Sequence, residues 1–198
     1  MLYKDSLELI GNTPLLELKR LKEKYKLNAN IYAKLENYNL TGSIKDRASL
    51  KMILKLEEEN KLKEGFTIIE ATSGNTGIAL AMLAQAYKIP LEIVMPASMS
   101  LERRQLIKAY GAKLILTDAS KGMQGSMDYM NEKLQQHENY LSLQQFNNEA
   151  NAYAHYYSTA QEILNDVTPD IFIAAIGTGG TITGIAKKLK NVDMGITD

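Results

Sequence analysis

Short apolar runs alternate with amphipathic stretches along this 198-residue chain. The runs are rich in Ile, Leu and Val and end in Gly, Pro, Ser or Thr, which is typical of strands. The amphipathic stretches repeat apolar residues every three or four positions, which is typical of helices. We expect strands at 15–19, 31–35, 67–71, 91–95, 113–117, 140–144 and 170–176, and helices at 45–60, 75–87, 100–110, 122–137, 149–165 and 181–189.

This order of elements predicts an α/β fold. Strands that alternate with helices form βαβ units, whose parallel sheets are covered by helices on both faces. The run 170–176 is apolar without alternation, as expected of a strand buried on both faces. Such a strand needs neighbours on each side, yet little chain follows it. We therefore expect an incomplete sheet, as in a fragment or in a domain that another chain completes.

Composition excludes several classes of function. The 23 Lys+Arg balance 23 Asp+Glu, which argues against a dedicated binder of nucleic acid or anionic membranes. The absence of cysteine excludes disulfides, thiolate metal sites and a cysteine nucleophile. His137 and His155 lack metal-ligand spacing, so we expect packing or surface positions for them and no metal site. Without a membrane-length apolar run or a signal-peptide pattern, the expected location is cytoplasmic.

Three loops rich in Gly, Ser and Thr each join a strand end to a helix start, where open α/β sheets bind ligands. In the first loop, residues 41–47, Lys45 falls in the first turn of a predicted helix. The partial positive charge of that helix end disfavours an ammonium group, so we expect a lowered pKa and a neutral, nucleophilic amine. The alternative is an ordinary exposed lysine.

The second loop, residues 72–77, reads Thr-Ser-Gly-Asn-Thr-Gly and opens the helix predicted at 75–87. Free backbone N–H groups and small hydroxyls converge in such a loop, which favours binding of a carboxylate or a phosphate. An N-capped helix after a simple turn is the alternative, but six consecutive small or polar residues exceed what one cap requires.

The third loop, residues 177–181, reads Gly-Thr-Gly-Gly-Thr and predicts a phosphate cup of backbone donors and threonine hydroxyls. It departs from the dinucleotide-binding fingerprint, because Ile182 stands where the third glycine belongs. It also departs from the P-loop pattern, since the chain contains no Gly-Lys pair. The alternative is a glycine-rich tight turn with no ligand.

Four motifs, in order, resemble those of the cysteine synthase/cystathionine β-synthase family of pyridoxal-phosphate enzymes, and within it the cysteine synthases. They are Ile10–Leu15, Ser43–Arg47, Thr72–Gly77 and Gly177–Thr181. The resemblance implies a fold-type II enzyme with two parallel-sheet α/β domains. The smaller domain would be 38–150, and the larger would combine 1–37 with 151–198 and lack its C-terminal remainder.

The resemblance also implies a role for each matched residue. Lys45 would bind pyridoxal 5′-phosphate covalently and move the substrate α-proton, and Asn75 would hydrogen-bond the 3′-oxygen of the cofactor. The substrate carboxylate would be held by Thr72, Ser73, Gly74, Thr76 and Gln145. The cofactor phosphate would be held by Gly177, Thr178, Gly179, Gly180 and Thr181.

The implied reaction is β-replacement: O-acetylserine loses acetate to leave a cofactor-bound α-aminoacrylate, and sulfide adds to give cysteine. Alternatives are cystathionine β-synthase chemistry, O-phosphoserine as substrate, or a non-catalytic truncated remnant that acts as an interaction partner. The family's partner for the pyridine nitrogen has no counterpart in this chain, which keeps an inactive form among the alternatives. The resemblance further implies a homodimer, with serine acetyltransferase as a candidate partner.

Overall fold

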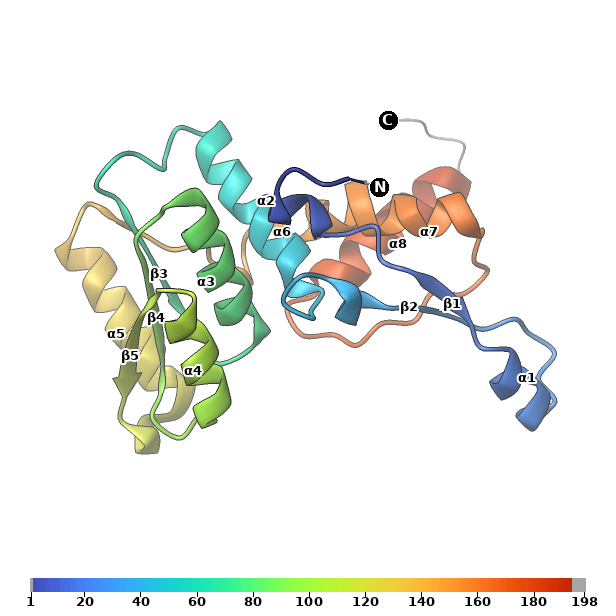
Figure 1. Ribbon diagram of the computed structural model, residues 1–198, viewed down its shortest axis with the longest axis horizontal. Coiled ribbons are helices and arrows are strands. Elements are labelled where there is room, and N and C mark those ends of the chain that lie inside the picture. Colours follow the sequence, from blue (N-terminus) through green and yellow to red (C-terminus); the bar gives the residue numbers. More distant parts are fainter. Residues whose placement is uncertain (1, 194–198) are drawn as a thin grey trace.

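A parallel four-stranded sheet occupies one side of the molecule in a computed structural model that describes residues 2–193 (Figure 1). The strand order is β5-β4-β3-β6, and each adjacent pair is parallel. Every residue of the central strand β4 is buried, as expected of a strand covered on both faces. The strands are β3 (Thr67–Ala71), β4 (Leu91–Pro96), β5 (Lys113–Thr117) and β6 (Tyr140–Leu141).

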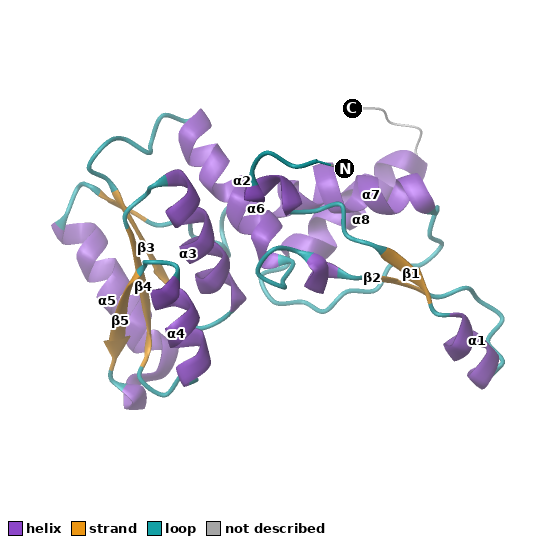
Figure 2. Cartoon of the chain, in the orientation of Figure 1, coloured by secondary structure: helices purple, strands orange, loops and turns teal. Residues whose placement is uncertain are grey.

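Helices cover both faces of this sheet, so the predicted α/β class is confirmed (Figure 2). Helices α3 (Asn75–Tyr87) and α4 (Leu101–Ala109) lie on one face, and α5 (Gly122–Gln136) lies on the other. The core between them consists of fully buried aliphatic side chains, each of which contributes roughly 1.5–3 kcal/mol. Its members include Ile68, Ile69, Leu80, Leu83 and Ile93.

Helix α2 (Lys45–Glu58) connects this sheet to a second group of elements. That group contains α6 (Glu149–Ala154), a π-helical turn η4 (His155–Thr159), α7 (Ala160–Asp166) and α8 (Gly180–Asp193). The predicted helix at 149–165 is thus one helical run that the π-helical turn interrupts. Within residues 2–193 no helix has both the length and the apolar character to cross a membrane.

The N-terminal strands depart from the expected parallel pairing. Strand β1 (Leu15–Glu17) pairs antiparallel with β2 (Tyr32–Lys34), and the short helix α1 (Lys19–Tyr25) lies between them in sequence. Single-turn 3-10 helices are η1 (Ser6–Leu9), η2 (Glu36–Tyr38) and η3 (Ala119–Lys121). Parallel pairing therefore holds for the four-stranded sheet but not for this hairpin-like pair.

The strand predicted at 170–176 is wrong for the described structure, in which this segment has no regular secondary structure. Ile171, Ile173 and Ile176 are 79%, 86% and 75% exposed rather than buried. A strand requires a neighbouring backbone to receive its hydrogen bonds, and no strand pairs with this segment within residues 2–193. The segment is apolar, but the described part of the chain supplies no partner strand for it.

Candidate functional site

Lys45 is the first residue of α2, and its side chain is partly buried. Its backbone N–H donates to Ser43 Oγ at 3.2 Å, while its Nζ has no hydrogen-bond or ion-pair partner among residues 2–193. Burial lowers the pKa of Lys45, because removing water disfavours the ammonium form. The direction of this pKa shift agrees with the prediction, although burial rather than the helix end is its cause.

The 72–77 loop meets Gln145, as the structure brings together positions 69 residues apart. Thr76 Oγ1 donates to Gln145 Oε1 at 2.9 Å, and both side chains are buried. Because the amide oxygen of Gln145 already accepts this bond, its NH₂ group is left to donate. A hydrogen-bond donor is what a carboxylate requires, so this pair fits the predicted grip on an anionic substrate.

The outer part of the same loop is open to solvent. Ser73 O accepts a 3.2 Å hydrogen bond from Arg103 Nη1 of α4, which ties the loop to that helix and leaves a cation beside it. A Cβ on Gly74 would meet no atom within 4 Å, so there is free space above the loop. Thr72 is buried at the end of β3, whereas Asn75 is exposed at the start of α3.

The predicted phosphate cup, residues 177–181, includes the loop before α8 and the first two residues of that helix. Gly179 has φ +81°, a left-handed conformation that favours glycine, and a Cβ on Gly177 would meet no atom within 4 Å. Helix α8 starts at Gly180, and the N–H groups of its first turn lack intrahelical acceptors. Backbone N–H donors at a helix start, together with the Thr178 hydroxyl, are the kind of groups that bind a phosphate.

Asn151 of α6 joins the two loops, and it is absent from the residues predicted by sequence. Its Nδ2 donates to Gln145 O and to Thr178 Oγ1, each at 2.8 Å, and the residue is only 4% exposed. The signal in the sequence was a polar residue one position after Ala150, within a helix whose other inward residues are alanines. Nothing local indicated its two partners.

His155 is buried, in agreement with the predicted packing position, but it also contacts the cup. Its Nε2 lies 3.3 Å from Thr181 Oγ1, and its Nδ1 lies 3.0 Å from Thr159 Oγ1. Burial, assisted by the positive charges of Arg47 and Lys45, lowers the pKa of His155 to about 4. His155 is therefore a neutral ring near pH 7.

Glu70 is a second buried polar residue outside the predicted site, although its carboxylate inside the apolar run 67–71 is unusual for a strand. It is buried in β3, and burial raises its pKa. Its Oε2 accepts from Ser142 Oγ at 2.9 Å and from Leu143 N at 3.0 Å. These bonds hold the loop that carries Gln145, directly after β6, which ends at Leu141, three residues before the predicted end.

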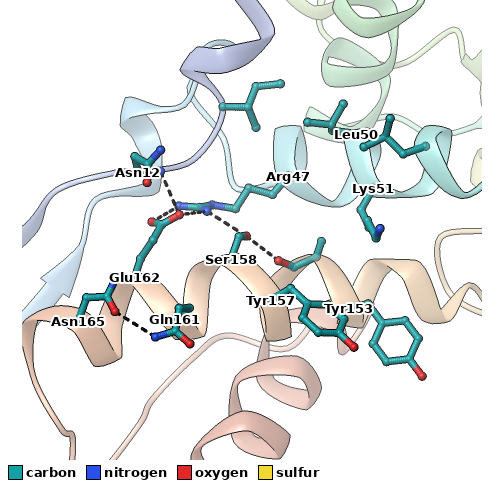
Figure 3. Close-up of a pocket in the computed structure, with 13 residues that line it drawn as sticks. Asn12, Arg47, Leu50, Lys51, Tyr153, Tyr157, Ser158, Gln161, Glu162 and Asn165 are labelled. Atoms are coloured by element: carbon teal, nitrogen blue, oxygen red, sulfur yellow. Dashed lines mark hydrogen bonds and ion pairs between the residues drawn. The ribbon is translucent and has the colours of Figure 1, made fainter. Parts of the chain in front are cut away.

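A cavity of about 470 Å³ lies between α2 and the α6–α7 region, away from the residues predicted to bind ligands (Figure 3). Arg47 lines this cavity and pairs with Glu162, with Nη1–Oε1 at 2.5 Å, and with Glu36, with Nε–Oε2 at 2.8 Å. Gln161 and Asn165 at its edge are hydrogen-bonded to each other. Because these polar groups form hydrogen bonds and ion pairs with one another, they leave fewer groups to bind a ligand in this cavity than the loops do.

Comparisons with known proteins agree with the family that the motifs resemble. The family described as "Pyridoxal-phosphate dependent enzyme" matches residues 7–197. A cysteine synthase of Aquifex aeolicus is 49% identical over 188 residues, which are 93% of this chain and 58% of that protein. A cysteine synthase B of Campylobacter jejuni is 48% identical over 185 residues, with 92% and 60% coverage.

A solved cysteine synthase of Entamoeba histolytica superposes with a TM-score of 0.92 at 41% identity, covering 97% of this chain and 58% of that one. A solved hydrogen sulfide-producing enzyme of Fusobacterium nucleatum superposes with a TM-score of 0.88 at 43% identity. The match covers 100% of this chain and 64% of that one. The chain thus spans about 60% of the length of the relatives it matches.

Proposed function

This chain belongs to the family of pyridoxal-phosphate dependent enzymes, and from that premise we propose that it acts in β-replacement of the cysteine synthase type. The reaction would convert O-acetylserine and sulfide into cysteine and acetate. The observation that carries the proposal is the run of hydrogen bonds from Thr76 through Gln145 and Asn151 to Thr178. It joins a carboxylate-binding loop to a phosphate-binding loop, and a substrate amino acid and the cofactor each supply one of these anions.

In this proposal Lys45 is the catalytic residue. Its lowered pKa favours a neutral amine, which can bond covalently to the cofactor carbonyl and later accept the substrate α-proton. Pyridoxal phosphate, when bound, supplies the electron sink for that proton removal. Partial burial of the lysine reduces the access of competing water to the reacting amine.

The remaining roles are assigned by position. The carboxylate of the substrate would be gripped by Thr72, Ser73, Gly74, Thr76 and the NH₂ group of Gln145. The phosphate would be bound by residues 177–181, and Asn75 would hydrogen-bond the 3′-oxygen. The corresponding domains are 38–150 for the substrate grip, and 1–37 with 151–198 for the cofactor. Support comes from the open space at Gly74 and Gly177, where an added Cβ would meet no atom within 4 Å.

The finer points of the proposal rest on the family resemblance. They are a homodimeric assembly, serine acetyltransferase as a protein partner and a cytoplasmic location. The choice of leaving group and nucleophile is also a proposal, because a 43% identical relative is named for producing hydrogen sulfide rather than for using it. Assaying O-acetylserine, O-phosphoserine and cysteine side by side, with sulfide measured in each reaction, separates these chemistries.

The proposal is tested by borohydride reduction of the chain with pyridoxal phosphate, followed by peptide mass analysis. We expect the adduct on Lys45 in the native chain and no adduct at this site in Lys45→Ala. Lys51→Ala is the matched control, because Lys51 lies on the same helix and pairs with Glu58 instead of facing the site. We then expect the native chain to form cysteine from O-acetylserine and sulfide.

Three results would change the conclusion. An adduct that persists at full yield in Lys45→Ala would show that another lysine binds the cofactor. Native chain that forms no adduct would contradict the proposed cofactor site. An adduct on Lys45 without cysteine formation would favour the non-catalytic alternative, in which this chain acts as an interaction partner.

A further inference from the structure

The side chain of Asn151 has only one orientation that satisfies its neighbours. Its amide nitrogen lies 2.8 Å from Gln145 O, and a backbone carbonyl can only accept a hydrogen bond. The nitrogen rather than the oxygen must therefore face Gln145. The second hydrogen of the same nitrogen points to Thr178 Oγ1, also at 2.8 Å. Both donor hydrogens of Asn151 are thus used, one on each loop.

This orientation dictates what the hydroxyl of Thr178 can do. A hydroxyl has two acceptor positions and one donor hydrogen. Thr178 Oγ1 accepts from Asn151 Nδ2 at 2.8 Å and from the backbone N–H of Gly180 at 3.4 Å. With both acceptor positions occupied, the hydroxyl hydrogen points away from these donors and can only donate. A phosphate in the cup would accept that hydrogen bond.

Close packing of α8 against α6 holds Asn151 in place. A Cβ on Gly180 would collide with the side-chain amide of Asn151, so the first turn of α8 lies directly against it. Gly184, one turn further, lies equally close to the backbone of α6, where a Cβ would collide with Ala152 O. The amide of Asn151 therefore cannot rotate without moving the helix that bears the cup.

We propose that Asn151 is a positioning residue that makes the Thr178 hydroxyl an obligatory donor to the cofactor phosphate and couples the phosphate cup to the substrate grip at Gln145. The inference rests on the proposed function. Thr76 orients the side chain of Gln145, while Asn151 holds its backbone, so displacement of either loop is transmitted to the other. Such coupling is reciprocal: phosphate in the cup changes the affinity for carboxylate by the same factor by which carboxylate changes the affinity for phosphate.

The test measures the dissociation constants of pyridoxal phosphate and inorganic phosphate by calorimetry. We expect Thr178→Val to weaken both about tenfold or more, since it removes a hydrogen bond to a charged group. Asn151→Asp keeps the shape of the side chain, but an aspartate can only accept hydrogen bonds. The Thr178 hydroxyl would therefore donate its hydrogen to the aspartate instead of to phosphate. We expect the affinity for phosphate to fall further in Asn151→Asp than in Asn151→Ala. Because Asn151→Ala acts through Thr178, the double variant should bind inorganic phosphate no more weakly than Thr178→Val.

The matched control for a purely structural effect is Ser126→Ala. Ser126 is fully buried and hydrogen-bonded to Thr117 Oγ1 at 2.8 Å, far from the cup, so we expect lower stability with unchanged phosphate affinity. The ³¹P chemical shift of bound cofactor provides a second readout, which should move in the Asn151 variants and not in Ser126→Ala.

The outcomes separate this inference from the proposed function. Native chain that binds neither pyridoxal phosphate nor inorganic phosphate would overturn both. Native binding together with unchanged phosphate affinity in Asn151→Asp, or with additive losses in the double variant, would overturn the inference alone. If the Asn151 variants do not fold, Thr178→Val and Thr178→Ser decide the matter: equal phosphate affinity in these two variants would contradict the role of the hydroxyl.

Discussion

At the scale of single residues, the buried polar side chains of this chain work in pairs that span distant positions. Glu70 holds the loop before Gln145, Asn151 joins that loop to the cup, and His155 contacts Thr181. Each would be costly if left without a hydrogen-bond partner, by roughly 1–3 kcal/mol. Their burial is therefore tolerated because of the pairing, and the pairing in turn orients the groups that we propose to face a ligand.

The neutral state of His155 predicts a pH dependence of stability. The pKa falls from 6.5 to about 4 on folding, so below pH 6.5 the unfolded chain binds a proton that the folded chain does not. The free energy of unfolding should therefore decrease as pH falls from about 6.5 to 4, by at most roughly 3 kcal/mol. Urea unfolding at pH 6.5 and pH 4 measures this decrease. In His155→Gln, the free energy of unfolding should fall much less between the two pH values than in the native chain.

The exposed His137 provides the control for this measurement. His137→Gln should show the same decrease between the two pH values as the native chain. A His155→Gln variant whose stability falls as steeply as that of the native chain would contradict a buried neutral ring.

At the scale of elements, Arg47 ties α2 to the segment beside β2 and to α7. It bonds Glu36 beside β2 and Glu162 on α7, and Lys34 bonds the same Glu162 with Nζ–Oε2 at 2.7 Å. Arg47 and Lys34 together hold the pKa of Glu162 at about 2, even though burial alone would raise it. Arg47 lies two residues from Lys45, so this network also anchors the first turn of α2.

Removal of Arg47 should therefore be strongly destabilising. Arg47→Met leaves two carboxylates partly buried without their main partner, which typically costs about 3–5 kcal/mol. Lys51→Met, which removes an ion pair with the exposed Glu58 on the same helix, should cost no more than about 1 kcal/mol. Urea unfolding at pH 7 compares the two, and equal losses would show that the buried network contributes little.

At the scale of the whole molecule, the extended segment at 170–176 presents an apolar surface to solvent. Ile171, Ile173 and Ile176 are more than 70% exposed, and a backbone outside regular structure offers free hydrogen-bonding groups beside them. An exposed, unpaired and apolar segment of this kind is a site for self-association.

We expect the purified chain to self-associate as its concentration rises, and Ile173→Ser to reduce this. Leu101→Ser is the control. Leu101 is also exposed, at 67%, but it is the first residue of helix α4 and lies outside the segment 170–176. Sedimentation velocity across a range of concentrations distinguishes the variants. A native chain that stays monomeric throughout and unfolds in one cooperative transition would contradict this expectation.

Much of the fold was predictable from local pattern. Strands β3 and β5 match their predicted bounds and β4 extends one residue past its own, since a buried strand requires a short apolar run whatever its neighbours are. The starts of α2, α3 and α5 were also predicted, because helix periodicity and the preceding Gly or Ser residues are local signals. The three loops predicted to bind ligands were located by the same signals and each leads into a helix, although only the loop at 72–77 directly follows a strand in the structure.

Tertiary structure decided what depends on a distant partner. Periodicity indicates that 170–176 is apolar, but pairing requires another backbone, which the described chain does not place there. Asn151 and Thr178 are 27 residues apart, and Arg47 and Glu162 are 115 apart, so neither contact has a local signal. The sequence by itself determined which residues can form elements and loops. The packing of α6 and α8 decided which polar groups meet, because hydrogen bonds depend on ångström-scale geometry that no residue specifies alone.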